Sequence, residues 1–272
     1  MSRVLAQFVV LAAALAAVFL LARPASAFEP GKTGILVLHG KHGNPGNFIA
    51  SYVSALRQAG FVVEAPETAW SGRRRYDVDY LQALAEVGQS LAALKARGVE
   101  RVVLAGHSMG GGAALAYAAR NAVGTERGGP ELAALILLAP GHTPEVGKQR
   151  DLLVEDVAMA RELVAHGKGD EKLQFRDLNV GRATDTWLPA ERFLTYFDPE
   201  GPAVMPINAA RVKKPLPVLW IVGSRDIVTK PASYAFDKLP AHPASRYQAV
   251  EADHMDTVRA SAPVVIEWLK GL

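Results

Sequence analysis

The stretch GHSMG at residues 106–110 fits the pattern G-x-S-x-G, and what lies on either side of it decides the fold. The apolar run RVVLA at 101–105 precedes it and predicts a buried strand. The small residues GGGAALAYAA at 110–119 follow and predict a helix that can pack close to a sheet. Ser108 is therefore expected in a sharp turn from strand to helix, with its hydroxyl raised above the sheet.

A serine presented in this way is a candidate nucleophile. The first turn of the helix at 109–120 would place free N–H groups and the positive end of the helix dipole beside the reacting oxygen. The alternative is a chance match on a tight turn. The strand on one side and the small-residue helix on the other favour the nucleophile.

Working outward, short apolar runs recur along the chain, separated by longer segments with helical spacing or small residues. The predicted strands are 34–38, 61–65, 101–105, 134–139, 218–222 and 247–250. The predicted helices are 77–97, 109–120 and 263–269, the last with Pro263 near its first position. Buried strands separated by helices indicate an α/β fold with a mostly parallel sheet covered on both faces. Ligands of such sheets bind at the carboxyl ends of the strands.

Residues 142–214 interrupt this rhythm. They carry no strand-like run, one helical pattern over 145–166, and then an irregular stretch with aromatic residues at 187–197. We expect a small cap or lid inserted between two strands of a single domain over 28–272. The aromatic residues either roof an apolar substrate pocket or form the core of the cap.

Over residues 31–272 the chain resembles the α/β-hydrolase superfamily of serine esterases and lipases, with no subfamily identified. The resemblance rests on GHSMG at 106–110, on the pair His39-Gly40 after the first strand, and on an Asp and a His in that order near the C-terminus. It implies that Ser108 is the nucleophile. Asp226, just past the strand at 218–222, would be the orienting acid, and His254, after the strand at 247–250, the base.

The oxyanion hole of such an enzyme needs two N–H donors. One is expected from Met109, the residue after the nucleophile. By resemblance, the second is the amide of Lys41 in the glycine-rich loop after the first strand, with His42 as the next candidate. His39 is expected to be structural, hydrogen-bonding this loop.

Candidates for the substrate pocket are weaker. Trp70 follows the strand at 61–65 and Trp187 lies in the insertion, while His42 and His142 follow strand ends. The three arginines at 73–75 also lie at the predicted active edge. They could bind an anionic group, but a solvated loop with one arginine paired to Asp77 or Asp79 is the favoured interpretation.

Composition narrows the chemistry further. The absence of cysteine excludes a disulfide scaffold, a thiolate metal site and a cysteine nucleophile. The histidines show no spacing typical of a metal site, and no phosphate-binding glycine motif is present, so neither metal nor cofactor is expected. Thirty basic and 27 acidic residues give a net charge of +3.

The first 27 residues account for most of that surplus. Arg3, the apolar run at 4–22 and the small residues Ala25-Ser26-Ala27 form the pattern of a secretory signal peptide. Cleavage after Ala27 would leave 28 basic and 27 acidic residues, a net charge of +1, which removes the suggestion of nucleic-acid binding. We expect a periplasmic or secreted protein without stable membrane insertion. An uncleaved N-terminal membrane anchor is the alternative.

The sequence thus predicts an exported serine hydrolase that cleaves small-molecule or lipid-like carboxylic esters through an acyl-enzyme. A thioesterase or carbon–carbon hydrolase with the same three residues is one alternative. A non-catalytic binding protein on a hydrolase scaffold is another, although the presence of all three residues argues against it. The oligomeric state is left open.

Overall fold

The computed structural model describes residues 28–121 and 130–272, so the predicted leader at 1–27 lies outside the described residues. Its main element is a six-stranded sheet in the order β2-β1-β3-β4-β7-β8, in which all neighbouring strands are parallel. The strands are β1 (Thr33–Leu38), β2 (Val62–Glu64), β3 (Arg101–His107), β4 (Leu132–Leu138), β7 (Val218–Gly223) and β8 (Arg246–Val250). The predicted α/β class is confirmed, and each of the six predicted strands is present.

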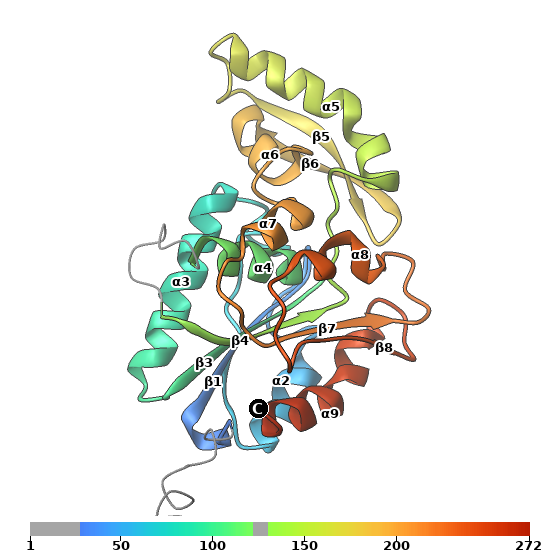
Figure 1. Ribbon diagram of the computed structural model, residues 1–272. Helices are drawn as coiled ribbons and strands as arrows, with labels where there is room; N and C mark the ends of the chain where they lie inside the picture. The colour runs from blue at the N-terminus through green and yellow to red at the C-terminus, as the bar shows by residue number, and fades with distance from the viewer. Residues whose placement is uncertain (1–27, 122–129) are drawn as a thin grey trace, which may run out of the picture.

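Helices cover both faces of this sheet (Figure 1). Side chains of β1 alternate between the two faces: Ile35 packs with α2 (Ala50–Gln58) and α9 (Asp256–Lys270), and Leu36 with α3 (Tyr80–Ala96) and α4 (Met109–Asn121). This double burial explains why the central strands β1, β3, β4 and β7 appear in the sequence as apolar runs rather than as alternating patterns.

The register brings the strand ends together at one edge. Leu38 of β1 pairs with Gly106 of β3, and Gly223 of β7 pairs with Val250 of β8. The chain runs outward in opposite directions from β1 and β3, so the loops after these two strands flank the switch point where ligands of open α/β sheets bind.

Between β4 and β7 lies an insertion, defined here as residues 143–204, most of which stands above the sheet in Figure 1. It contains α5 (Gly147–Ala165), β5 (Lys172–Asn179), β6 (Arg182–Pro189) and α6 (Ala190–Phe197). Strands β5 and β6 form an antiparallel hairpin, so the expectation of no strand-like run was wrong. The inward-facing positions of β5 include Phe175 and Asp177, both fully buried, and the buried carboxylate conceals the apolar alternation of the strand.

The aromatic residues of the insertion pack against one another. Phe175 stacks on Phe193 with ring centroids 4.1 Å apart, and Phe193 stacks on Phe197 at 4.7 Å. All three are fully buried. They form the core of the insertion, which was one of the two interpretations of the aromatic stretch, rather than a roof over a substrate.

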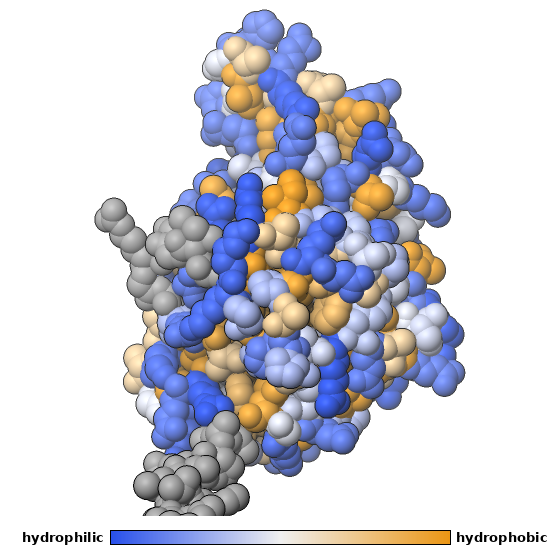
Figure 2. All heavy atoms as spheres, in the orientation of Figure 1, coloured by the Kyte–Doolittle hydropathy of each residue, from blue (hydrophilic) through white to orange (hydrophobic). Residues whose placement is uncertain are grey.

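Figure 2 shows hydrophobic atoms scattered among hydrophilic ones over the insertion and over the sheet part of the molecule. Exposed apolar side chains of the insertion include Val154 and Trp187. Within the described ranges, no helix has the length and apolar character needed to cross a bilayer.

The last helix starts earlier than predicted. Helix α9 begins at Asp256, and Pro263 lies inside it rather than near its first position. The start is set by Asp253, whose Oδ1 accepts the amides of Met255 at 3.0 Å and Asp256 at 2.8 Å. The helix continues through the proline, which removes one backbone donor, because its apolar face is buried against the sheet.

Short elements complete the chain. They are α7 (Met205–Arg211), α8 (Ala232–Ala235) and two 3₁₀ turns, Pro30–Lys32 and Phe236–Lys238.

Candidate active site

Ser108 lies in the tight turn between β3 and α4, with φ of +53°. The two flanking glycines make this turn possible. A Cβ on Gly106 would lie 2.1 Å from the carbonyl oxygen of Gly110, and a Cβ on Gly110 would lie 2.6 Å from that of Leu38. The amide of Ser108 donates to the carbonyl of Leu138 at 3.0 Å, which ties the strained turn to β4.

The side chains of Ser108, His254 and Asp226, drawn from three separate loops, form a hydrogen-bonded chain. His254 Nε2 lies 2.9 Å from Ser108 Oγ, and His254 Nδ1 lies 2.8 Å from Asp226 Oδ2. Because an ionised carboxylate only accepts hydrogen bonds, Nδ1 carries the ring proton and Nε2 is free to accept from the serine hydroxyl. The arrangement can deprotonate a nucleophilic hydroxyl.

The hydrogen-bond partners of Asp226 keep its carboxylate ionised although its side chain is buried. Burial of the side chain raises its pKa. This effect is outweighed by hydrogen bonding and charge attraction from His254 and by a hydrogen bond from the amide of Val228, which lies 2.8 Å from Oδ1. The net result is a pKa of Asp226 below its ordinary value. The side chains of His254 and Asp226 are 4% and 0% exposed, so their interaction is shielded from water.

The loop after β1 lies directly beside the serine. A Cβ on Gly40 would lie 3.1 Å from the Cβ of Ser108. The amide of His42 donates to the carbonyl of Trp70 at 2.9 Å and is therefore engaged within the loop. The backbone amide of Lys41 donates to no acceptor among the described residues, which leaves it available to a ligand.

On the other side of the serine, the amide of Met109 opens helix α4, where backbone N–H groups lack intrahelical partners. Further along the helix, the amides of Gly111 and Gly112 are engaged: both donate to the carbonyl of Ser108, at 2.9 and 3.2 Å.

His39 fixes the loop after β1, as expected. Its Nδ1 lies 2.8 Å from the carbonyl of Gly40, and its Nε2 accepts from the amide of Thr68 at 3.2 Å. Burial lowers the pKa of His39. Trp70 is fully buried and donates from its indole to the carbonyl of His39 at 2.8 Å.

Two cavities open on either side of Ser108. The α5-side cavity, about 320 Å³, is lined by Ser108, His142, Val146, Ile227 and Val228 among others. The β1-loop cavity, about 440 Å³, is lined by residues that include His42, Asn44, Phe48 and Met255. Lys41, Ser108, Asn179, Val180 and His254 line both cavities.

The four predicted pocket residues divide into two groups. His42 lines the β1-loop cavity and His142 lines the α5-side cavity. Trp70 and Trp187 line neither, so their proposed role in the pocket was wrong. Trp70 supports the loop from the core, and Trp187 on β6 is 63% exposed, because the inward side of the strand at that point is taken by its neighbours Thr186 and Leu188.

The arginines at 73–75 are engaged in their own loop. Arg73 pairs with Glu67, and Arg74 pairs with Asp77 at 3.0 Å and with Glu86 at 2.6 Å. The interpretation as a solvated loop with an arginine paired to Asp77 is confirmed.

Two residues next to the site escaped the sequence reasoning. Gly141 follows β4, and a Cβ there would lie 3.2 Å from Ser108 Oγ and 3.7 Å from His254 Cε1. Its position directly after a strand end was the only available signal. The second residue is Asp177 of β5, whose carboxylate contacts the ammonium of Lys41 at 2.6 Å.

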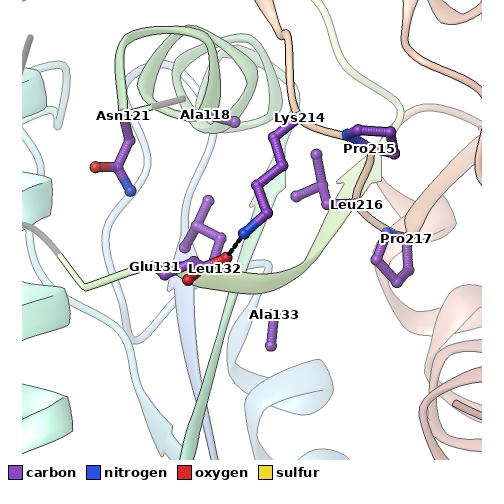
Figure 3. A pocket seen from close by; sticks show the side chains of 9 residues that line it. All are labelled: Ala118, Asn121, Glu131, Leu132, Ala133, Lys214, Pro215, Leu216 and Pro217. Carbon is purple, nitrogen blue, oxygen red and sulfur yellow. Dashed lines mark hydrogen bonds and ion pairs between the residues drawn. The ribbon is translucent and has the colours of Figure 1, made fainter. Parts of the chain in front are cut away.

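A third cavity of about 440 Å³ lies far from this site, where β4 and β7 begin (Figure 3). It is lined by Asn121, Leu132 and Pro217, and the ion pair of Glu131 with Lys214 crosses it. It lacks the hydrogen-bonded chain that marks the opposite edge. Over 28–121 and 130–272, no group of three or more His, Cys, Asp or Glu is arranged to hold a metal ion.

Comparisons with known proteins match the chain to one family and to several solved structures of similar fold. The model of the alpha/beta hydrolase family matches residues 35–267. A monoacylglycerol lipase of Paleococcus ferrophilus superposes with a TM-score of 0.62 at 20% identity, covering 89% of this chain and 95% of that one. A thermostable carboxyl esterase of Bacillus coagulans has a TM-score of 0.62 at 16% identity, covering 90% and 92%. The thioesterase domain from a curacin biosynthetic pathway has a TM-score of 0.54 at 17% identity, covering 90% and 93%. A search of the curated proteins found no match.

Proposed function

Because the chain belongs to the alpha/beta hydrolase family, we propose that it is a serine hydrolase that cleaves carboxylic esters through an acyl-enzyme. The observation that carries the proposal is the position of the His254 imidazole, 2.9 Å from Ser108 Oγ and 2.8 Å from Asp226 Oδ2. These are the distances that a base needs to activate a serine and an acid needs to orient the base.

In the first half of the reaction, Ser108 Oγ attacks the acyl carbonyl while His254 Nε2 takes the hydroxyl proton. The amides of Met109 and Lys41 donate to the oxyanion that forms. The tetrahedral intermediate collapses when His254 returns the proton to the leaving alcohol. Asp226 holds the ring tautomer and stabilises the transient imidazolium.

In the second half, a water molecule takes the place of the alcohol. His254 removes its proton, the hydroxide adds to the acyl carbonyl, and the same two amides stabilise the second oxyanion. Collapse releases the carboxylic acid and restores the Ser108 hydroxyl. One ester and one water thus give one acid and one alcohol.

The two cavities that share Ser108 support a small or lipid-like ester substrate. With about 320 and 440 Å³ on the two sides of the nucleophile, the acyl and alcohol parts of an ester can each occupy one cavity.

The test is the variant Ser108→Ala, compared with Ser261→Ala, which removes the hydroxyl of another buried serine in α9. We expect Ser108→Ala to lose hydrolysis of p-nitrophenyl esters and covalent labelling by a fluorophosphonate probe, and Ser261→Ala to retain both. A Ser108→Ala protein that keeps both activities would refute the proposal.

We further propose that the protein is exported and cleaved after Ala27, on the sequence pattern of its first 27 residues. Expression with the full leader followed by N-terminal sequencing should yield a chain that begins at Phe28. A retained Met1 in the membrane fraction would instead support an uncleaved anchor.

A further inference from the structure

The ion pair of Lys41 with Asp177 is buried on both sides. Among the lysine and arginine ion pairs of the described residues, it is the only one in which both partners are buried. Lys41 Nζ lies 2.6 Å from Asp177 Oδ1, and the two side chains are 4% and 0% exposed. Elsewhere at least one partner reaches solvent, as in the neighbouring pair of Arg176 with Asp156, where the exposed fractions are 39% and 11%.

The polar atoms of this buried pair are well supplied with partners. Besides Asp177, the ammonium of Lys41 reaches the carbonyl of Leu178 at 3.0 Å and lies 5.3 Å from the ring centroid of Phe197. Asp177 Oδ1 also accepts the amide of Leu178 at 2.7 Å, and Oδ2 accepts the hydroxyl of Tyr76 at 3.3 Å. Burial and the Asp177 carboxylate raise the pKa of Tyr76, which keeps this hydroxyl a donor.

The two partners come from opposite sides of the proposed active site. Lys41 belongs to the loop after β1 and follows Gly40, which lies against Ser108. Asp177 belongs to β5 of the insertion. The turn at the end of β5 lines both cavities beside Ser108 through Asn179 and Val180.

Lys41 is therefore fixed both at its backbone and at the end of its side chain. On the side of the sheet, the amide of the next residue, His42, donates to the carbonyl of Trp70 at 2.9 Å. On the side of the insertion, the lysine side chain is fixed by Asp177. A buried ion pair contributes little stability compared with a well-packed apolar pair. The presence of the Lys41–Asp177 pair is therefore better explained by the position in which it holds Lys41.

We propose that Asp177 is a positioning residue that acts through the side chain of Lys41 to hold the Lys41 amide where it meets the oxyanion. The proposal rests on the function proposed above, because it assigns that amide to the oxyanion hole. It makes the insertion a structural part of the catalytic machinery, with β5 fixing a group that the loop after β1 contributes.

The test uses Asp177→Asn, Lys41→Met and the double variant Lys41→Met/Asp177→Leu, with Asp156→Asn as the matched control. Asp156 holds the same strand, because its Oδ2 accepts the amide and the guanidinium of Arg176 at 3.0 and 2.9 Å, but its ion pair is partly exposed. For each protein, kcat and KM for p-nitrophenyl butyrate and the melting temperature are measured.

We expect kcat to fall about 100-fold in both single variants with little change in KM, because small displacements of a catalytic group cost about that much. The double variant removes both buried charges, so its melting temperature should return toward that of the wild type while kcat stays low. Asp156→Asn should retain kcat.

A purely structural role predicts a different result, in which kcat recovers together with the melting temperature in the double variant. That recovery, or an unchanged kcat in Asp177→Asn, would overturn the inference. Both outcomes leave the loss of activity in Ser108→Ala intact, so they can be told apart from a failure of the proposed function.

Discussion

His107 holds the loop that carries His254: its ring Nε2 lies 3.0 Å from the backbone carbonyl oxygen of His254 and donates to it. The residue before the proposed nucleophile is thereby connected to the proposed base, although the side chains of His107 and His254 have different roles. Burial, followed by the neighbouring His254, lowers the pKa of His107 to about 3. A neutral ring with its proton on Nε2 suits this support role.

The first prediction concerns stability in acid. Burial also lowers the pKa of His142 to about 3, with the nearby Lys41 adding to the effect. In the unfolded chain a histidine binds a proton near pH 6.5, whereas His107 and His142 stay neutral in the folded protein. The unfolded state therefore binds more protons as the pH falls from 6.5 toward 3. We expect the free energy of unfolding to decrease by about 1.4 kcal/mol per pH unit for each of the two.

Urea unfolding at pH 7, 6 and 5 measures this slope. His107→Gln and His142→Gln should each reduce it, because they remove the group that takes up the proton on unfolding. His166→Gln is the control, since His166 is exposed at the end of α5. An equal slope in all four proteins would contradict the assignment of neutral buried histidines.

The second prediction concerns the space beside the nucleophile. Gly141→Ala would place a methyl group 3.2 Å from Ser108 Oγ, where the acyl group of a substrate would bind in the proposed reaction. Gly141 is not among the residues with positive φ, so alanine fits its backbone. We expect kcat/KM to fall about 100-fold with little change in melting temperature. Gly31→Ala, where an added Cβ meets nothing within 4 Å, should behave as wild type; equal activity of the two variants would show that this space is not used.

The third prediction concerns the tip of the β5–β6 hairpin. Val180 has φ of +47° and Gly181 has +77°, a two-residue turn that favours Asn-Gly over Val-Gly. Val180→Asn should stabilise the fold by about 1 kcal/mol by relieving this strain. Because Val180 lines both cavities, the preference for longer acyl chains should fall roughly fourfold, the equivalent of about 0.8 kcal/mol for one methylene group.

A series of p-nitrophenyl esters and of the corresponding thioesters, from two to ten carbons, measures this preference and also reports which bond is cleaved faster. A stabilised Val180→Asn protein with an unaltered chain-length profile would mean that the turn does not contact the acyl chain.

The four central strands β1, β3, β4 and β7 could be predicted because they are buried almost throughout and therefore appear as nearly unbroken apolar runs. The edge strands β2 and β8 are only partly buried. The β5–β6 hairpin could not be predicted, because its strand β5 buries Asp177 where the alternation calls for an apolar residue. The predicted start of α9 was also wrong. Proline is common at the first position of helices, so Pro263 suggested a helix start. The capping role of Asp253 depends on a loop geometry that is not visible in the sequence.

For the site, the strand–turn–helix pattern indicated Ser108. The resemblance to the hydrolase superfamily indicated Asp226 and His254, each in the loop after a strand that ends at the same edge. The surroundings of these residues were harder to predict. Trp70 follows a strand of the same sheet, yet its indole turns inward to His39. The contact of Lys41 with Asp177 joins residues 136 positions apart and depends on how the insertion folds back, which no local pattern encodes.

The presence of two cavities at one serine has a consequence for the order of product release. In the proposed reaction each half of an ester occupies its own cavity, so the alcohol would diffuse out of one cavity while the acyl group stays bound to Ser108 in the other. In that reaction the emptied cavity would be the channel through which the hydrolytic water reaches the acyl-enzyme. A second alcohol could enter by the same route and intercept the acyl group, so in the proposed reaction the shape of that channel would set the balance between hydrolysis and transfer to another acceptor.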